Sequence, residues 1–353
     1  MPDVLQVITD TDRRGAQVFA ADLHEALDGR LTMRTVALAP GRYPNGLELP
    51  VLGASRMGRD TLQALRRQMR QADVTVAHGS TTLPACAIAG LGLAAPFVYR
   101  QISDQGFWVD TRAKHLRVTA LVRRARMTVA LWAGAAETLI TRFRIPPGRV
   151  RTIPNGVPAV RHGVPTPSQR ASARERFGLD PARPVVLSIG ALAPEKGVDL
   201  VVRAVAREPD WQLLVVGAGP EESGLQELAR HSAPGRVRFA GPIDDPVAAF
   251  AAADVVALAS RGGDSMPAVL IEAGLAQLPS VATPIEGIVE VVLSGRTGEL
   301  ARVENDASLA DGLRLCLERR VAYGRAARQH CLEHFEIQVV AAQWEALLRA
   351  TAR

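Results

Sequence analysis

The chain has 353 residues, with 42 Lys or Arg and 36 Asp or Glu, so its formal net charge is +6. A hydrophobic content of 47% is enough for two buried cores, which excludes a disordered chain, and the length favours two domains. Three widely spaced cysteines argue against both a disulfide framework and a zinc site. Because arginines occur throughout the chain, the charge does not indicate nucleic acid as a partner.

The beginning of the chain lacks the basic segment and apolar run of a secretion signal. The longest uncharged stretch, 83–99, is interrupted by two prolines and two glycines, so it does not predict a membrane span. We therefore expect a protein of the reducing cytoplasm.

From the start of the chain to residue 153, short apolar runs alternate with longer amphipathic stretches. The runs predict strands at Val4–Ile8, Arg34–Leu38, Val74–Ala77, Pro96–Tyr99, Met127–Leu131 and Val150–Ile153. The stretches predict helices at Ala16–Leu27, Thr61–Gln71, Leu83–Ala89, Leu116–Ala125 and Ala133–Arg142. This order is typical of a parallel sheet with helices on both faces.

The alternation stops at Pro158 and resumes at residue 185. Pro158–Gln169 holds three prolines, as a linker would, and one short helix is expected at Ala171–Phe177. Strands are then predicted at Val185–Ile189, Trp211–Val216, Val237–Ala240, Val255–Ala259 and Ser280–Thr283. Helices are predicted at Val198–Ala206, Glu222–Ala229, Pro246–Ala252, Ala268–Ala276, Ile288–Leu293 and, without interruption, Ser308–Arg353. Ligands in such folds bind at the carboxyl ends of the strands.

Residues 262–274 form the richest motif of the chain. Ser265 suits a helix N-cap and Pro267 a first turn, so a helix begins after a Gly-Gly loop and offers an anion site. Glu272 is the only polar side chain of this helix and points back toward its N-terminus, where sugar hydroxyls are suitable donors for it. Asp264 lies in the loop ahead. The alternative is a solvated Asp264 and a Glu272 bonded to nearby backbone.

Two further turns follow predicted strands. Gly190 would let the backbone approach a phosphate, and Lys196 would provide a point charge, although a Glu-Lys-Gly turn is common. Lys196 is one of only two lysines among the 42 basic residues, which favours a need for an ammonium group there. The turn from Gly217 to Gly219 is weak evidence for a nucleotide, because it lacks the third glycine of a dinucleotide motif.

In this order and spacing, the motifs resemble the retaining GT-B glycosyltransferases of family 4. Members close their N-terminal domain with an Asn-Gly-Val corner, here at 155–157. They also carry an acidic residue and, after seven intervening residues, a Glu, here Asp264 and Glu272, and then a Gly-x-x-Glu, here 287–290. The resemblance spans nearly the whole second half of the chain. It is looser in the first half, where Gly15 matches a glycine turn whose usual first glycine is replaced by Arg14.

The resemblance implies an α/β fold of two Rossmann-like domains that face a cleft (GT-B), with the C-terminal helix crossing back to the N-terminal domain. It implies an acceptor-side domain of residues 1–158 plus about 337–353, a linker at 159–181, and a nucleotide-sugar domain at 182–336.

The resemblance also implies retaining, metal-independent transfer of a hexose from a UDP- or GDP-sugar to an acceptor hydroxyl, without a cofactor. The acceptor would be a glycan, a lipid-linked molecule or a small molecule, as in cell-envelope or exopolysaccharide biosynthesis. Asp264 would lie beside the donor sugar, Glu272 would accept the ribose hydroxyls, and Lys196 would bind the pyrophosphate. Further donor contacts are implied at Gly15, Gly190, Gly217, Gly219, Pro242, Ile243, Ser265, Met266, Pro267, Ala268 and Val269. The carboxylates of Asp10 and Asp12 are interpreted as a strand-end turn rather than as a metal site.

Three departures from the family pattern affect the expected site. Ala191 replaces an arginine that binds pyrophosphate in the family; Arg13 or Arg14 would substitute for it, and the alternative is weak activity. The acid at position 264 is Asp rather than Glu, and no His follows the strand that ends at Tyr99. His78 is therefore a catalytic candidate, with a structural role as the alternative. Acceptor-side candidates are Arg100 and Asp104.

The predicted helix around residues 112–126 is strongly basic. It would fit an anionic membrane surface at the inner membrane face, or a phosphorylated acceptor, and the alternative is a solvated helix face. Two other functions remain open on the same fold: a sugar-nucleotide epimerase or hydrolase, and a non-catalytic partner subunit, suggested by Ala191 and the missing His. An oxidoreductase would rest on Gly217 and Gly219 alone.

Overall fold

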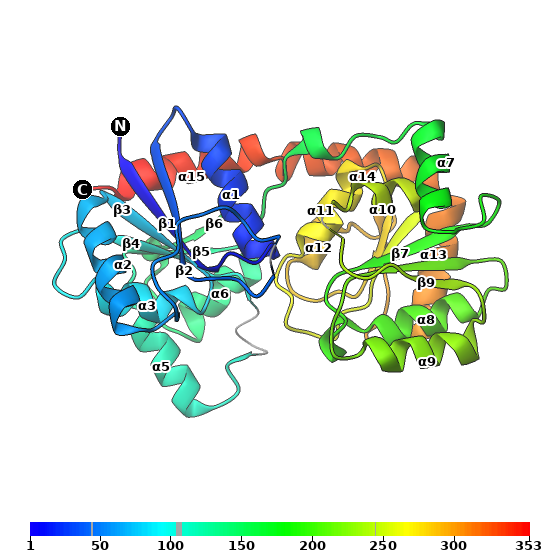
Figure 1. Ribbon diagram of the computed structural model, residues 1–353, viewed down its shortest axis with the longest axis horizontal. Coiled ribbons are helices and arrows are strands. Elements are labelled where there is room, and N and C mark those ends of the chain that lie inside the picture. The colour runs from blue at the N-terminus through cyan, green and yellow to red at the C-terminus, as the bar shows by residue number, and fades with distance from the viewer. Residues whose placement is uncertain (44, 104–107, 244) are drawn as a thin grey trace. The chain divides into compact units, whose positions relative to one another are not determined.

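The computed structural model describes residues 1–43, 45–103, 108–243 and 245–353 (Figure 1). The chain divides into two compact units. Unit 1 consists of Met1–Val157 and Ile337–Arg353, and unit 2 consists of Pro158–Glu336. Among the described residues, no helix is both long and apolar enough to cross a membrane.

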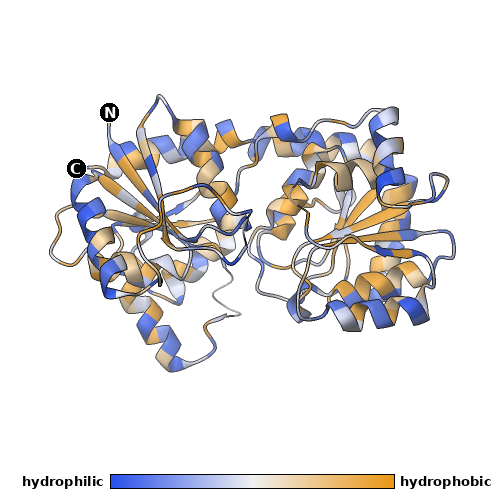
Figure 2. Cartoon of the chain, viewed as in Figure 1, coloured by the Kyte–Doolittle hydropathy of each residue, from blue (hydrophilic) through white to orange (hydrophobic). Residues whose placement is uncertain are grey.

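Unit 1 is built on a parallel six-stranded sheet in the order β2-β1-β3-β4-β5-β6. Its strands are β1 (Asp3–Asp10), β2 (Thr32–Ala39), β3 (Val74–His78), β4 (Phe97–Arg100), β5 (Met127–Ala130) and β6 (Val150–Thr152). Its helices are α1 (Gly15–Leu27), α2 (Arg59–Gln71), α3 (Thr82–Ala89), α5 (Arg112–Val122), α6 (Ala133–Thr141), the 3-10 helix η1 (Pro147–Arg149) and α15 (Ile337–Thr351). Both faces of the sheet are covered, so its strands are mostly apolar runs rather than alternating ones (Figure 2).

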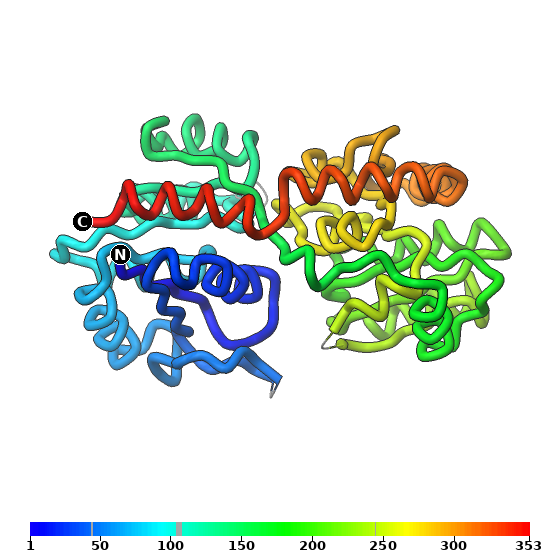
Figure 3. The backbone as a smooth tube through the Cα atoms, turned by 90° about the horizontal axis from the view of Figure 1, so that it is seen from above, coloured from blue at the N-terminus to red at the C-terminus, as the bar shows by residue number. Residues whose placement is uncertain are grey.

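The two faces of this sheet have separate cores. On one face, α1 and α15 lie side by side (Figure 3), and Trp344 of α15 is completely buried with Leu23 of α1. On the other face, α2, α3, α5 and α6 pack on a second core that includes Leu65, Cys86 and Leu139. The chain therefore returns to complete unit 1 after unit 2 is finished.

Unit 2 has a parallel six-stranded sheet in the order β12-β11-β10-β7-β8-β9. Its strands are β7 (Val185–Ile189), β8 (Gln212–Val216), β9 (Val237–Phe239), β10 (Val255–Leu258), β11 (Ser280–Ala282) and β12 (Gly298–Leu300). Its helices include α7 (Pro167–Arg176), α8 (Val198–Ala206), α9 (Glu222–Ser232), α10 (Val247–Ala252), α11 (Ala268–Leu275), α12 (Ile288–Val291), α13 (Asp306–Glu318) and α14 (Arg320–His334). Short 3-10 helices lie at η2 (Ala159–Arg161) and η3 (Pro194–Lys196).

The predicted fold class is confirmed, since both sheets are parallel and alternate with helices. β12 was missed because its residues Gly-Glu-Leu do not form an apolar run that would predict a strand. The prediction of one uninterrupted helix from Ser308 to Arg353 is wrong: the chain leaves the helical conformation at Arg319 and again between α14 and α15, where it passes from unit 2 to unit 1. Within the expected linker, α7 starts at a complete capping box of Thr166 and Gln169 and belongs to unit 2.

Candidate functional site

Three glycine turns meet at the carboxyl edge of the unit 2 sheet. Gly190, Gly217 and Gly241 follow β7, β8 and β9, and all have positive φ, of 147°, 134° and 68°. A Cβ atom on Gly217 would lie 1.8 Å from the carbonyl oxygen of Gly190, and one on Gly219 would lie 2.2 Å from that of Leu192. The Gly217 N–H donates to the carbonyl of Gly241 at 2.9 Å. These glycines therefore permit the three turns to pack backbone against backbone.

We expect Gly217→Ala to lower the melting temperature of the protein, because the new methyl group meets backbone at a φ that L-residues rarely adopt. Gly15→Ala is the matched change in unit 1: nothing lies within 4 Å of the added Cβ, so folding should be unaffected. Thermal unfolding by circular dichroism measures both. An equal melting temperature for Gly217→Ala and the unaltered protein would contradict the packing described above.

A charged cluster lies between the turns that follow β7 and β10. The ammonium group of Lys196, at the end of η3, donates to one carboxylate oxygen of Asp264 and forms a salt bridge with it. The hydroxyl of Ser260 donates to the other oxygen at 2.5 Å. The side chains of Lys196 and Asp264 are 24% and 13% exposed, so the pair is shielded without being closed off from solvent. Lys196, Asp264 and Ser260 thus form one polar centre, although Lys196 and Asp264 are 68 positions apart in the sequence.

Arg261 fixes the position of this cluster, and sequence reasoning missed it. Its guanidinium donates to both carboxylate oxygens of Asp199, at 2.8 and 2.9 Å, and to the carbonyl of Pro194 at 2.8 Å. It also pairs with Glu304. The hydrogen bonds that Arg261 donates to the carboxylates of Asp199 and Glu304 raise the pKa of its guanidinium above the ordinary value. Arg261 therefore ties the turn that carries Lys196 to the loop that carries Asp264.

The loop after Asp264 leads into α11. The helix begins at Ala268 with Pro267 as its N-cap residue, so the prediction of Ser265 as the N-cap is wrong. Ser265 instead accepts a hydrogen bond from the N–H of Gly287 through its carbonyl, at 2.7 Å. Its hydroxyl is buried and has no hydrogen-bond partner among the residues that the structure describes. A buried polar group without a partner is uncommon in native proteins, and the role of Ser265 in donor binding stays a prediction.

The other expected donor-binding residues of unit 2 lie on the same edge of the sheet. Met266 is buried, whereas Ala268 and Val269 form the half-buried first turn of α11. Glu272 is half-buried one turn further along the helix. In the turn after β9, Pro242 is exposed and Ile243 is half-buried. Their binding roles stay predictions.

In unit 1, the turn after β1 gathers charged side chains around Asp10. This buried carboxylate accepts from Arg14 at 2.6 and 2.8 Å, from Arg56 at 2.7 Å and from the Gln17 amide at 2.9 Å. Burial alone would raise the pKa of Asp10, but these hydrogen bonds and charges lower it below the ordinary value. Asp12 accepts from the backbone N–H groups of Arg42 and Tyr43. Both carboxylates are thus engaged in holding the turn beside the exposed Gly15.

His78 and Arg100 both lie in the core that α1 covers. They are cross-strand partners in β3 and β4, and each is 1% exposed. His78 shares a hydrogen bond with the side chain of Gln6 at 2.9 Å, and burial together with the charge of Arg100 lowers its pKa well below the ordinary value. The guanidinium of Arg100 stacks on the ring of Phe19, 3.7 Å from its centroid. Neither side chain is presented at the surface of unit 1, and Asp104 lies outside the described residues.

The Asn-Gly corner packs on α15. Arg100 donates to the side-chain oxygen of Asn155. A Cβ atom on Gly156 would lie 2.9 Å from the Cβ of Val340, and the N–H of Ile337 donates to the carbonyl of Val157 at 3.1 Å. The two points at which the chain leaves and re-enters unit 1 are therefore bonded to each other.

Comparison with known proteins gives consistent results for both halves of the chain. A model described as glycosyl transferases group 1 matches residues 169–330, and a model described as Glycosyltransferase Family 4 matches residues 13–161. D-inositol 3-phosphate glycosyltransferase from Nocardia farcinica is 33% identical over 257 residues, which are 68% of this chain and 53% of that protein. A GDP-mannose-dependent monoacylated alpha-(1-6)-phosphatidylinositol monomannoside mannosyltransferase from Corynebacterium glutamicum is 30% identical over 57% of this chain and 56% of its own. The chain spans about half the length of the curated relatives it matches.

Solved structures agree with this fold. Anabaena HepE in complex with UDP-glucose has a TM-score of 0.89 at 21% identity and covers 99% of this chain and 100% of its own. Sucrose-phosphate synthase from Thermosynechococcus elongatus has a TM-score of 0.85 at 19% identity and covers 99% of each chain. With one family model on each unit and the motifs of residues 190–290 in place, the chain belongs to the GT-B glycosyltransferases of family 4, glycosyl transferases group 1.

Proposed function

We propose that this protein transfers a hexose from a UDP- or GDP-sugar to an acceptor hydroxyl, with retention of anomeric configuration and without a metal ion. The observation that carries the proposal is the polar centre of Lys196, Asp264 and Ser260, at the carboxyl edge of a parallel sheet and just ahead of α11. The cation and the helix N-terminus there would attract the negative diphosphate of a sugar nucleotide, and the carboxylate would accept hydrogen bonds from the sugar hydroxyls.

In the proposed reaction, the bond between the anomeric carbon and the diphosphate breaks, and the acceptor oxygen bonds to the same face of that carbon. The acceptor's proton passes to the leaving phosphate oxygen, so no histidine is required. This agrees with the enclosure of His78 in the core. Lys196 and the N-terminus of α11 would stabilise the negative charge that develops on the diphosphate.

Donor binding requires Lys196 to exchange partners. Without donor, the ammonium group is neutralised by Asp264. When Lys196 turns to the pyrophosphate, Asp264 keeps the hydrogen bond from Ser260 and can accept from a sugar hydroxyl. Glu272 is proposed to accept the ribose hydroxyls, and the Ser265 hydroxyl to gain the partner that it lacks. Among the described residues, no three His, Cys, Asp or Glu side chains are grouped to hold a metal ion, and metal independence stays part of the proposal.

The donor and the acceptor are proposed from the relatives' names. HepE was solved with UDP-glucose, and the Corynebacterium mannosyltransferase is named for GDP-mannose, so both bases enter the test. The named acceptors are an inositol phosphate and an acylated phosphatidylinositol mannoside, which makes polyol phosphates and lipid-linked polyols the first acceptors to examine. The proposed place of action is the cytoplasm, with the segment 112–126 as the part that would contact the inner membrane face.

The experiment is a product analysis. Purified protein is incubated with UDP- and GDP-hexoses, with and without inositol phosphates and phosphatidylinositol, and products are followed by NMR of the anomeric proton. The proposal expects a new glycoside with the donor's anomeric configuration, and loss of product with Glu272→Ala. Inverted product, or donor breakdown at an equal rate without acceptor, would contradict it and favour a hydrolase or epimerase.

A further inference from the structure

Arg261 follows Ser260 of the polar centre, and its guanidinium is fully engaged by protein groups. Nε donates to Glu304, Nη1 to the carbonyl of Pro194 and to Asp199, both at 2.8 Å, and Nη2 to Asp199 at 2.9 Å and to Glu304 at 3.2 Å. These five bonds use every N–H group that a guanidinium has. An arginine that binds a phosphate needs its fork for the ligand, so Arg261 is suited to hold the protein rather than a substrate.

Most of these bonds act on the turn that presents Lys196. Pro194 is the first residue of η3 and Lys196 the last, and Asp199 lies in the first turn of α8, which begins two residues after Lys196. The backbone N–H of Arg261 adds a bond to the carbonyl of Glu195 at 2.7 Å. Arg261 therefore holds the chain on both sides of Lys196, through its backbone as well as through its side chain.

The residue after Lys196 leaves the backbone of this turn little room to shift. Gly197 has a φ of 61°, and a Cβ atom there would lie 2.1 Å from the carbonyl oxygen of Ala259, the residue that follows β10. The turn is thus pressed against the end of β10 at Gly197 and fastened to the same segment by Arg261. A change of partner by Lys196 is then left to its side chain alone.

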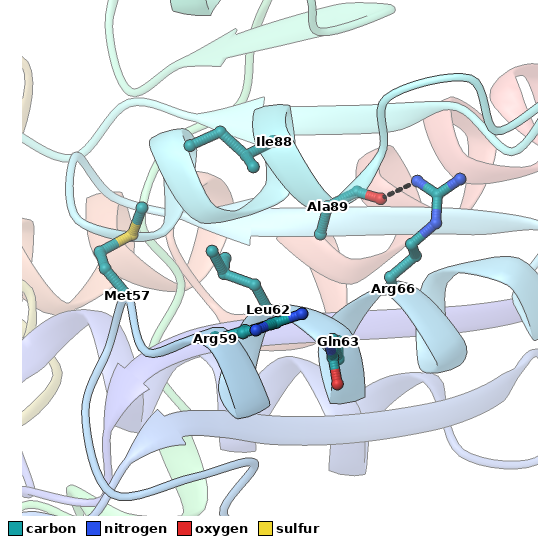
Figure 4. Close-up of a pocket in the computed structure, with 7 residues that line it drawn as sticks. All are labelled: Met57, Arg59, Leu62, Gln63, Arg66, Ile88 and Ala89. Atoms are coloured by element: carbon teal, nitrogen blue, oxygen red, sulfur yellow. Dashed lines mark hydrogen bonds between the residues drawn. The ribbon is translucent and has the colours of Figure 1, made fainter.

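An arginine in unit 1 shows a simpler clamp of this kind. Arg66 of α2 donates through one nitrogen to the carbonyls of Ala89 and Leu91, at 2.8 and 2.6 Å, beside a groove of about 370 Å³ between α2 and α3 (Figure 4). Those bonds close the end of α3. Arg261 instead makes most of its bonds to carboxylates, and such charge-assisted bonds are about twice as strong as neutral ones. This extra strength indicates that the exact position of the Lys196 turn matters.

We infer that Arg261 is a positioning residue for Lys196 in the transfer reaction. It fixes the backbone of the turn, so that only the ammonium group moves from Asp264 to the diphosphate when the donor binds. The inference rests on the proposed function for this diphosphate, and it assigns to Arg261 no contact with the donor. Because Ala191 supplies no charge, Lys196 is the cation of this turn, and its displacement would act directly on the diphosphate.

The first test follows the Lys196 side chain without any donor. The chain has only two lysines, so protein labelled with ¹³C at the lysine Cε gives two side-chain NMR signals, which Lys114→Arg assigns. Arg261→Gln removes the charge and the fork, and it should move the Lys196 signal toward the position of a lysine in water. An unchanged Lys196 signal in Arg261→Gln, with the fold intact by thermal unfolding, would overturn the inference.

The matched control for this test is Arg314→Gln. Arg314 of α13 also joins two carboxylates, those of Asp311 and Glu208, and neither belongs to the polar centre or to the turn of Lys196. Its replacement should leave the Lys196 signal where it is in the unaltered protein. Equal movement in both variants would show a general response of unit 2 to a lost arginine and would also overturn the inference.

The second test is a double-mutant cycle on transfer kinetics. Arg261→Lys keeps the charge but loses the planar fork, and should lower kcat/KM by about ten-fold, since a misplacement of about 1 Å costs on the order of a hundred-fold. If Arg261 acts through Lys196, the same change should cost nothing further in Lys196→Ala protein. An equal fold-loss with and without Lys196 would reveal a merely structural role. Arg314→Lys should leave kcat/KM unchanged.

Failure of the proposed function has a different signature. If no nucleotide sugar reacts with the unaltered protein, the kinetic cycle has no signal, but the lysine NMR signals still decide whether Arg261 positions Lys196. If transfer occurs and Arg261→Lys costs the same in both backgrounds, the proposed function stands and the role of Arg261 is wrong.

Discussion

Lys196→Ala should lower kcat/KM for sugar transfer by about a hundred-fold or more, in the range found when one group that stabilises a developing negative charge is removed. The reason is the placement of this ammonium group beside Asp264 and ahead of α11, at the edge where the proposed diphosphate leaves. Steady-state kinetics with a soluble acceptor measure it. Arg302→Ala, which removes an exposed cation of unit 2, is the control and should leave kcat/KM unchanged.

Two companion variants separate charge from geometry. Lys196→Arg keeps the charge but replaces a compact ammonium with a planar fork, so it should recover only part of the loss. Asp264→Asn frees Lys196 from its salt bridge. It should therefore leave nucleoside diphosphate affinity equal or improved while slowing transfer. If Lys196→Ala kept full activity, or if Asp264→Asn weakened nucleotide binding as much as it slowed transfer, the exchange of partners proposed for Lys196 would be wrong.

Asp254→Ala should destabilise unit 2 by about 3–5 kcal/mol, the usual cost of removing one partner from a buried ion pair. Asp254 is 8% exposed and accepts from the buried Arg174 at 2.6 Å, from Arg170, and from the N–H of Val185 at 2.8 Å. Arg320 lies 3.4 Å from it. Without the carboxylate, three guanidinium groups from α7 and α14 are left facing one another.

Thermal unfolding checks this prediction, and a fall in melting temperature of roughly 10 °C is expected for a unit of this size. Asp311→Ala is the matched control, because the Asp311 side chain is 74% exposed in its pair with Arg314. Its loss should cost less than about 1 kcal/mol. Equal melting temperatures for the two variants would contradict a central role for Asp254 in joining α7 to the rest of unit 2.

Periodicity alone was sufficient for most of the fold. The apolar runs at Val185–Ile189 and Val255–Ala259 are long enough to identify buried parallel strands. Periodicity could not predict β12, whose three residues are held by pairing with β11. It also could not predict the break near Arg319, where no Gly or Pro marks the end of a helix. Those features depend on neighbours in space rather than on local pattern.

The site was predictable in its residue types but not in its contacts. Motif and spacing predicted Gly190, Lys196 and Asp264 as binding residues, and these roles stay predictions. The hydrogen bond between Lys196 and Asp264 and the contacts of Arg261 join segments distant in sequence, which spacing does not reveal. His78 shows the opposite outcome. Its position at a strand end suggested a cleft residue, but Trp344, 266 positions later, closes the core over it. The sequence pattern places a residue at the edge of a sheet, but it does not show whether a helix from later in the chain buries that residue.

Calorimetric titration of UDP and GDP into the unaltered protein and into Glu272→Ala tests the donor site most directly. We expect one of the two nucleotides to bind at a single site, and Glu272→Ala to weaken it by about ten-fold or more, the effect of losing a hydrogen bond to a charged group. Failure of both nucleotides to bind, or equal affinity in the variant, would contradict a nucleotide-sugar site built on Lys196, Asp264 and Glu272.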